Sequence, residues 1–290
     1  MFEGVIDFRS LGLEPEITSI GPFVLRWYSL AYLFGIILGW MYLRKLLKKP
    51  GAPMSLQHAD DFVTWATIGI ILGGRLGYVI FYAPATFIAD PIAIFKLWEG
   101  GMSFHGGVAG VTLAIAWFAR RNGIDFVRIC DYVACVYPIG HLLGRLANFN
   151  NGELWGRPTD GTWGIIFPDA GPEPRHPSQL YEGALEGLLL FIILWFLFWK
   201  TGARRYPGLL VGVFSVGMGV ARFAVEFFRE PDRQLGILET GLTMGQTLTV
   251  PLVIVGVYMI ATSRKRMEKG DARRLAEAQG DGGEPVQKSG

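Results

Sequence analysis

The stretch FVRICDYVACVYPIGHLLGRLANFNNGELWG, residues 126–156, runs from an apolar block into a polar motif. A helix of about 20 mostly apolar residues crosses roughly 30 Å of hydrocarbon, and residues 126–147 form such a block. Arg145 and Asn148 lie at its end, and Asn151 and Glu153 follow. An arginine at membrane depth needs an anionic partner or a functional role. The stretch therefore predicts a membrane-spanning helix that ends in a polar site.

The rest of the chain has the same block structure. Of its 290 residues, 51% are hydrophobic and 13% aromatic, and the apolar residues are concentrated in long runs instead of at amphipathic spacing. Six further blocks are long enough to span a membrane, near residues 22–44, 61–83, 103–119, 179–199, 207–228 and 242–262. We expect an all-α polytopic membrane protein of about seven transmembrane helices.

The blocks and their short connections leave room for one transmembrane catalytic domain, residues 1–263, with an external loop region at 148–178. The last residues, 264–290, are rich in Gly, Lys, Arg and Glu and cannot bury enough apolar area to fold alone. We expect a charged cytoplasmic tail there that is disordered or lies on the surface. No cleavable signal peptide is expected at the start, which lacks a basic segment followed by an apolar one.

Lysine and arginine gather beside alternate ends of the predicted spans, and such clusters face the cytoplasm. They lie at residues 44–49, 120–128, 200–205 and 264–266. This places the N-terminus outside, the C-terminus inside, and external loops around residues 84–102, 148–178 and 229–241. The net charge of +2 then reflects topology, and no nucleic-acid partner is expected.

A first candidate site is GGMSFHGG, residues 100–107, at the external start of the third predicted span. Glycines let a backbone approach a ligand closely, and they surround His105. An imidazole with a pKa of about 6.5 is a suitable general base for a thiol of pKa about 8.5. We expect His105 to be catalytic, although a lone histidine is more often structural.

Arg145 and Asn148 form a second candidate site, because residues three apart share one face of a continuing helix. The planar guanidinium can hold a phosphate by two parallel hydrogen bonds, and the amide adds a donor and an acceptor. Glu153, in the turn-rich loop that follows, could pair with an arginine. The alternative is an arginine that snorkels to the interface.

Two further polar clusters enter or leave apolar blocks. PRHPSQLYEG, residues 174–183, leads to Glu182 and Glu186, which either balance buried arginines or lie near the interface. In ARFAVEFFREPD, residues 221–232, Arg222 and Glu226 have the spacing of an intrahelical ion pair, which could be purely structural. One buried pair is costly in lipid, so we expect Arg222 and Arg145 to face one polar cavity that opens outward. Arg75, in the second predicted span, is a third intramembrane arginine.

These motifs resemble the bacterial prolipoprotein diacylglyceryl transferases. The family signature is similar to Gly-Arg-x-Gly/Ala-Asn-Phe-x-Asn-x-Glu-x-x-Gly, which Gly144–Gly156 matches. HGG at 105–107, HPSQLYE at 176–182 and RFxxEFFRxPD at 222–232 resemble its other blocks, in the same order. The resemblance covers all seven predicted spans.

The resemblance implies an enzyme of the bacterial cytoplasmic (inner) membrane whose site faces the periplasm. It would move the sn-1,2-diacylglyceryl group of phosphatidylglycerol to the thiol of the lipobox cysteine in a prolipoprotein, forming a thioether and releasing glycerol 1-phosphate. His105 would activate the thiol, and Arg145 and Arg222 would hold the phosphate. The remaining site residues carried over from the family are Tyr28, Asn148, Glu153, Gly156 and Glu226. The reaction implies no cofactor and no metal.

Some positions depart from the family pattern. Asn150 replaces an expected aliphatic residue, and Met218 replaces a tyrosine. His141 is not part of the motif, but it lies four residues before Arg145 on the same helical face. It is therefore a competing base, and we favour His105 because of its glycine-rich setting.

Two other classes of protein use similar features. A transporter or lipid flippase also carries intramembrane Arg/Glu pairs and glycine-broken spans, but it is expected to have two related halves, and none are visible in this sequence. A structural or interaction membrane protein has no use for so many embedded ionisable groups. Neither class would form a covalent product, which is the feature that separates them from a transferase.

Overall fold

The structure, a computed structural model, is mostly helical and describes residues 5–20, 23–85, 90–96, 100–161, 163–231 and 241–280. Within these residues, five helical segments are long and apolar enough to cross a membrane. They are α1 (Trp27–Leu47), α2 (Leu56–Phe81), α5 (Phe126–Asn150), the run Ser178–Lys200, and α9 (Met244–Gly280) as far as Ala272. The chain is therefore a multi-pass membrane protein.

Helices also occupy the two remaining predicted blocks. They are α4 (Phe104–Arg121) and α8 (Leu209–Val225), and α8 has 17 residues. The run Ser178–Lys200 consists of α6 (Ser178–Glu182), the π-helical segment η4 (Gly183–Leu189) and α7 (Leu190–Lys200). Short 3-10 turns lie at η1 (Phe8–Leu11), η2 (Pro91–Phe95) and η5 (Ala203–Arg205). Every predicted block thus contains a helix. The predicted external loops 84–102 and 229–241 lie partly outside the described residues.

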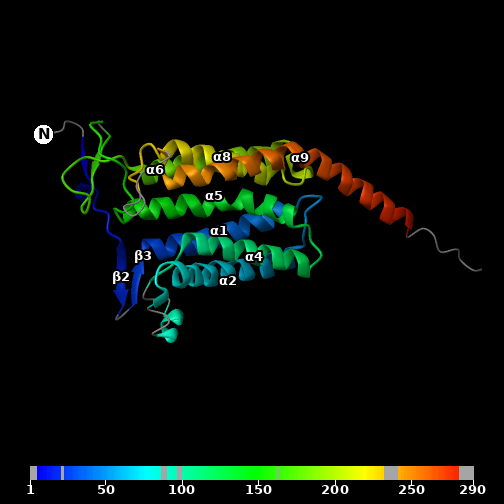
Figure 1. Ribbon diagram of the computed structural model, residues 1–290, viewed down its shortest axis with the longest axis horizontal. Helices are drawn as coiled ribbons and strands as arrows, with labels where there is room; N and C mark the ends of the chain where they lie inside the picture. The colour runs from blue at the N-terminus through cyan, green and yellow to red at the C-terminus, as the bar shows by residue number, and fades with distance from the viewer. Residues whose placement is uncertain are drawn as a thin grey trace, which may run out of the picture. The chain divides into compact units, whose positions relative to one another are not determined.

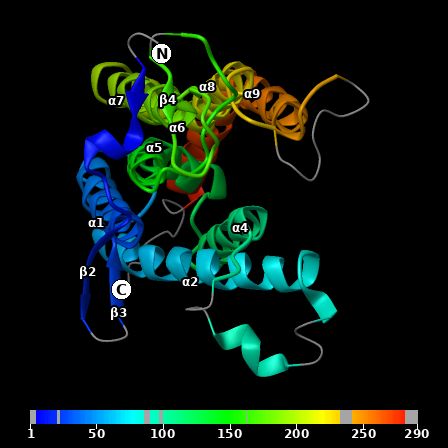
Figure 2. The ribbon, with the colours of Figure 1, turned by 90° about the vertical axis from the view of Figure 1, so that its left-hand side faces the viewer.

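The start of the first predicted block is not helical. Residues Phe23–Arg26 form strand β3, which pairs antiparallel with β2 (Glu16–Ile20), as Figure 2 shows. Thr18 lies opposite Leu25 and Ser19 opposite Val24. β-branched residues on both strands favour this pairing, and hydropathy alone does not distinguish an apolar strand from the start of an apolar helix. The prediction of helix from residue 22 was therefore wrong, and α1 begins at Trp27.

The C-terminal end also differs from the sequence-based expectation. Helix α9 continues past the apolar block to Gly280 (Figure 1), so residues 264–280 are helical and not disordered. Ala, Leu, Lys, Arg and Glu are strong helix formers, and a helix already formed in the membrane removes the cost of nucleation. The helix contradicts disorder for residues 264–280, whereas the alternative of a tail that lies on the surface stays a prediction. Residues 281–290 lie outside the described part.

The chain separates into two compact units, Ile36–Val136 and a second one made of Met1–Gly35 and Tyr137–Gly290. In the first, α2 and α4 pack along each other; in the second, α8 and α9 do so (Figure 1). Gly212 and Gly256 lie at the α8–α9 contact, where a Cβ on either one would lie 2.9 Å from the carbonyl oxygen of the other. Whether residues 1–263 act as one domain stays a prediction.

A small core organises the loop that follows α5. Strand β1 (Ile6–Asp7) pairs in parallel with β4 (Ile165–Ile166). Phe8, Ile165 and Phe167 are buried together, and Phe149 packs against them from the end of α5. This core fixes the loop against α5, and it thereby positions the polar residues between them.

Candidate active site

Glu182 is the centre of the polar cluster in the unit Met1–Gly35 and Tyr137–Gly290. Its side chain is fully buried, and three arginines contact it. Arg145 Nε and an Arg222 guanidinium nitrogen each lie 2.9 Å from Glu182 Oε2, and an Arg229 nitrogen lies 2.8 Å from Oε1. The arginines come from α5, from α8 and from the segment after α8. The structure therefore brings Arg145 and Arg222 together, as the sequence predicted.

Arg222 joins a second carboxylate to this cluster. Its other terminal nitrogen lies 3.2 Å from Glu226 Oε2, the predicted intrahelical pair. Glu226 is buried beneath the first turn of α9, where a Cβ on Gly245 would lie 2.8 Å from its carboxylate. The five residues Arg145, Glu182, Arg222, Glu226 and Arg229, here called the arginine cluster, carry three positive and two negative charges. The arginine side chains keep 15–21% of their surface exposed, so the cluster can meet an anion.

The polar motif after Arg145 forms a hydrogen-bonded chain. Helix α5 continues to Asn150, and Arg145 donates to Asn148 Oδ1 at 3.1 Å, which confirms the predicted shared face. Asn148 Nδ2 then donates to Glu153 Oε1 at 2.9 Å, and Asn151 donates to the same oxygen at 3.1 Å. In the described residues two asparagine amides thus hold Glu153, and not the arginine with which the sequence suggested it could pair. The chain fixes the orientation of Arg145.

Gly156 lies where the loop crosses two other segments. Its N–H donates to the carbonyl oxygen of His176 at 2.8 Å, and its backbone bridges to Arg229. A Cβ here would lie 2.8 Å from both Cβ and O of His176 and would press on the Phe228 carbonyl. Only glycine fits, and this close approach holds the backbone of Arg229 beside the loop. The requirement for glycine is therefore explained by packing.

Tyr28 lies in the first turn of α1. Its hydroxyl lies 3.3 Å from that of Tyr32, and the two rings are 5.0 Å apart. Arg145 and Glu153 lie within electrostatic reach of its hydroxyl. The structure thus places Tyr28 in the same unit as the arginine cluster.

His105 belongs to the other unit, near the start of α4, where Ser103 Oγ caps the helix by accepting from Gly106 N at 3.1 Å. The glycine after it has a packing role: a Cβ on Gly106 would lie 2.9 Å from the Gly77 Cα and would press on the Gly73 carbonyl. Gly106 therefore lets α4 approach α2. The packing role of Gly106 weakens the interpretation that the glycines around His105 let a ligand approach the backbone. The role of His105 stays a prediction.

Arg75 lies in the same unit, Ile36–Val136, and its guanidinium binds backbone carbonyl groups there. It is 4% exposed, and its guanidinium donates to the carbonyls of Ile94 at 2.8 Å and Gly101 at 3.1 Å, and also to that of Gly100. These contacts tie the segment between α2 and α4 to α2. Its backbone contacts assign Arg75 a structural role.

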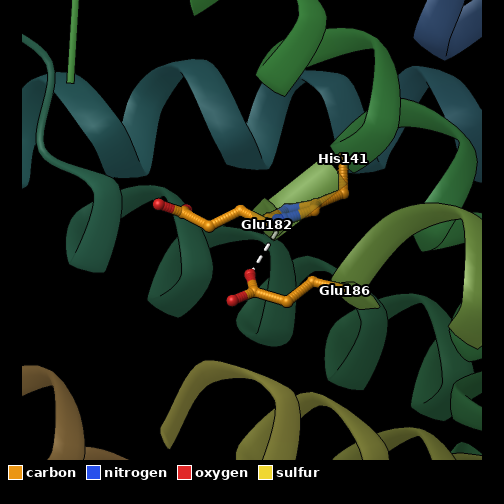
Figure 3. Close-up of side chains that lie close together, drawn as sticks. All are labelled: His141, Glu182 and Glu186. Carbon is orange, nitrogen blue, oxygen red and sulfur yellow. Dashed lines mark ion pairs between the residues drawn. The ribbon is translucent and has the colours of Figure 1, made fainter. Parts of the chain in front are cut away.

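A third group lies around His141, one turn before Arg145 on α5. His141 Nε2 is 2.9 Å from Glu186 Oε2, and Glu182 lies beside them, as Figure 3 shows. These three residues offer ligand atoms within 4.8 Å of one another, so the set could hold a metal ion. However, Glu182 already binds three arginines, and their positive charges oppose the binding of a metal cation. The expectation that no metal takes part stays a prediction.

His176 lies outside the membrane-spanning segments, on the loop before α6. Its Nδ1 is 3.2 Å from the Tyr181 hydroxyl, and its ring packs edge-on against Phe228 at 5.1 Å. Burial lowers the pKa of His176 from its ordinary 6.5, and Asp160 opposes this shift. The neutral form is therefore favoured at neutral pH.

Sequence reasoning did not include Glu182 and Arg229 among the site residues. The signal for Glu182 was present, because the sequence suggested that it could balance buried arginines. Arg229 follows the end of α8 and carries no helical spacing to its partner, which is 47 residues away. Only the tertiary structure reveals that contact.

Comparisons with known proteins agree with these motifs. The family model for prolipoprotein diacylglyceryl transferase matches residues 15–262. The chain is 55% identical to a phosphatidylglycerol–prolipoprotein diacylglyceryl transferase of Zymomonas mobilis, over 91% of this chain and 95% of the relative. It is 50% identical to the Erythrobacter litoralis protein of that name, over 94% and 97%, and 52% identical to that of Bradyrhizobium diazoefficiens, over 90% and 95%.

Proposed function

This chain belongs to the prolipoprotein diacylglyceryl transferase family, and on that premise we propose that it transfers the diacylglyceryl group of phosphatidylglycerol to a prolipoprotein cysteine at the arginine cluster. The acceptor is the thiol of the lipobox cysteine. The products are a thioether-linked prolipoprotein and glycerol 1-phosphate. This is the first step of bacterial lipoprotein modification.

The observation that carries the proposal is the convergence of Arg145, Arg222 and Arg229 on the buried Glu182. In the reaction, the thiolate sulfur attacks a glyceryl carbon, and the C–O electron pair moves to the phosphate. The phosphate thereby gains negative charge, and donors fixed in advance stabilise such charge best. Glu182 keeps the three guanidinium groups in place before the lipid arrives.

We assign Arg145 and Arg222 to the phosphate. Both keep part of their surface exposed, 19% and 21%, while Glu182 is fully enclosed. Guanidinium groups remain charged at all accessible pH values and bind phosphate oxygens in pairs. Charge that develops on the leaving phosphate is therefore met without a proton transfer.

The other assigned residues shape the lipid site. Asn148 and Glu153 orient Arg145 through their hydrogen-bonded chain, Glu226 orients Arg222, and Gly156 permits the approach of the Arg229 backbone. Tyr28 supplies a hydroxyl near Glu153 and Arg145. We assign His105 as the base that takes the proton of the thiol, with His141 as the alternative.

The proposal includes a location and a topology. Seven spans, with the N-terminus outside, place the cluster toward the periplasmic side of the cytoplasmic (inner) membrane. The basic residues beside alternate span ends support this orientation.

The test is an adduct assay. The purified full chain is incubated with phosphatidylglycerol and a lipobox peptide, and mass spectrometry follows the diacylglyceryl mass on the cysteine. We expect the adduct and a matching amount of glycerol 1-phosphate. A folded protein that makes neither product overturns the transferase proposal. Lipid that changes leaflet without forming an adduct would indicate a flippase.

Variants connect the activity to the site. Arg145→Ala and Arg222→Ala should abolish the adduct, and His105→Gln should do so if that histidine is the base. Arg266→Ala is a matched control, because Arg266 also hydrogen-bonds within this unit but contacts Pro207, before the start of α8. Arg222 lies in the last turn of α8. At a rise of about 1.5 Å per residue, Pro207 and Arg222 are therefore roughly 20 Å apart. The control should keep its activity.

A further inference from the structure

A buried pair, His141 and Glu186, lies beside the arginine cluster, and the mechanism so far uses it only through His141 as the alternative base. Glu186 is fully buried and His141 keeps 8% of its side-chain surface. His141 Nε2 and Glu186 Oε2 are 2.9 Å apart, yet in the described residues neither Glu186 oxygen forms a well-oriented hydrogen bond. A buried carboxylate normally accepts several hydrogen bonds. Within the described residues, His141 is thus the ion-pair partner of Glu186.

Glu182 adds a second carboxylate beside the His141–Glu186 pair. Its ligand atoms and those of His141 and Glu186 lie within 4.8 Å of one another (Figure 3). Two carboxylates at such distances resist being ionised together. Glu182 already pairs with three arginines, so the His141–Glu186 pair is the place in this group where a proton can be added.

Other ionisable groups face the pair from several elements. Tyr137, on α5, stacks on the His141 ring, and its hydroxyl lies 3.4 Å from His141 Nδ1. Tyr32 of α1, Arg145 of α5 and Arg222 of α8 lie within electrostatic reach of Tyr137 and hence of this region. The pair is thus placed between tyrosine hydroxyls and the arginine cluster.

We propose that the His141–Glu186 pair is a proton-binding site coupled to the anion at the arginine cluster, so that the pair takes up a proton when a phospholipid phosphodiester binds beside Glu182. The proton comes from solvent, and no covalent bond of the lipid changes in this step. The inference rests on the proposed function, because it takes the phosphate of phosphatidylglycerol as the anion.

The physical basis is linkage between two charges. A phosphodiester brings one negative charge next to a pair that is already short of hydrogen-bond donors, and in a buried site this charge acts strongly on its neighbours. Protonation of the pair then becomes more favourable. By reciprocity, a protonated pair binds the anion more tightly. His141 and Glu186 act through the arginine cluster, so they are positioning residues.

The test measures protons directly. Short-chain phosphatidylglycerol, whose phosphodiester does not titrate near neutral pH, binds to the purified full chain in calorimetry with two buffers of different ionisation enthalpy. We expect uptake of up to one proton per lipid bound. We also expect the Kd to rise with pH, by at most about tenfold per pH unit. Wild-type binding with no proton uptake overturns the inference.

Variants assign the proton to the pair. Glu186→Gln, and the double variant His141→Gln with Glu186→Gln, should lose the uptake and bind with a pH-independent Kd. The matched control is His58→Gln in the other unit, a half-buried histidine whose Nδ1 is buried and has no hydrogen-bond partner in the part of the chain that the structure describes. Its proton count should equal that of the wild type. If Glu186→Gln takes up as many protons as the wild type, the pair is not the site.

The adduct assay separates the two proposals. A chain that takes up a proton with the lipid but never forms the adduct would overturn the transferase proposal and keep the coupled pair. A chain that forms the adduct without any proton uptake would overturn the coupled pair alone.

Discussion

Arg145 and Arg222 come from different helices and contact the same atom, Oε2 of Glu182, at 2.9 Å each. One buried carboxylate therefore fixes two cations that would otherwise repel each other. Breaking a buried ion pair leaves uncompensated charge and typically costs about 3–5 kcal/mol. The arrangement is rigid because each arginine also has a second partner, Asn148 or Glu226.

Glu182→Gln should disable the arginine cluster. The amide is neutral, so three guanidinium groups lose their shared counter-charge and separate. We expect adduct formation to fall by about 10²-fold or more, since removal of one preorganised electrostatic contact has that effect. The rate of adduct formation and the thermal unfolding temperature in detergent measure both consequences. A variant with wild-type rate would mean that Glu182 does not organise the site.

Arg222→Lys should impair activity although it keeps the charge. Arg222 uses two nitrogens, one toward Glu182 and one toward Glu226, and a lysine offers one compact ammonium. We expect kcat/KM for phosphatidylglycerol to fall by about tenfold or more. Arg266→Lys, in which the replaced arginine contacts Pro207, is the control. Equal activities of the two variants would contradict the role assigned to the second contact.

Gly106→Ala should destabilise the packing of α4 on α2. The added methyl would lie 2.9 Å from the Gly77 Cα, and overpacking of this kind typically costs about 1–3 kcal/mol. We expect a lower unfolding temperature. Gly107→Ala is the matched control, because its Cβ would lie 3.7 Å from the Ile70 carbonyl, an ordinary contact. If the neighbouring variants lose stability equally, the helix crossing is not the cause.

His176→Gln should make the protein less sensitive to acid. Because of burial, the folded-state pKa of His176 lies below its ordinary value of 6.5. His176 therefore contributes to the stability of the fold at pH values above 6.5. The contribution is lost as the pH falls through the lower, folded-state pKa. Unfolding temperatures at several pH values between about 8 and 5 should therefore fall less in the variant than in the wild type. Parallel pH profiles would rule out this contribution.

The sequence determined what depends on local geometry. Block length and hydropathy located the helices, because a span needs about 20 apolar residues. The contacts of Arg145 with Asn148 and of Arg222 with Glu226 followed from helical spacing. Where propensity and hydropathy disagreed, the prediction failed: Phe23–Arg26 is an apolar strand, and the charged residues after Arg264 continue a helix.

Only the tertiary structure decided which charges meet. Glu182 contacts arginines that are 37–47 residues away in the chain, and no periodicity encodes such contacts. The tertiary structure also showed that Gly106 lets α4 pack closely on α2 and that His141 faces Glu186. The sequence identified the ionisable residues whose burial in lipid is energetically costly. The partners of these residues depend on how the helices pack. The role proposed for Arg145 therefore depends on a carboxylate from α6.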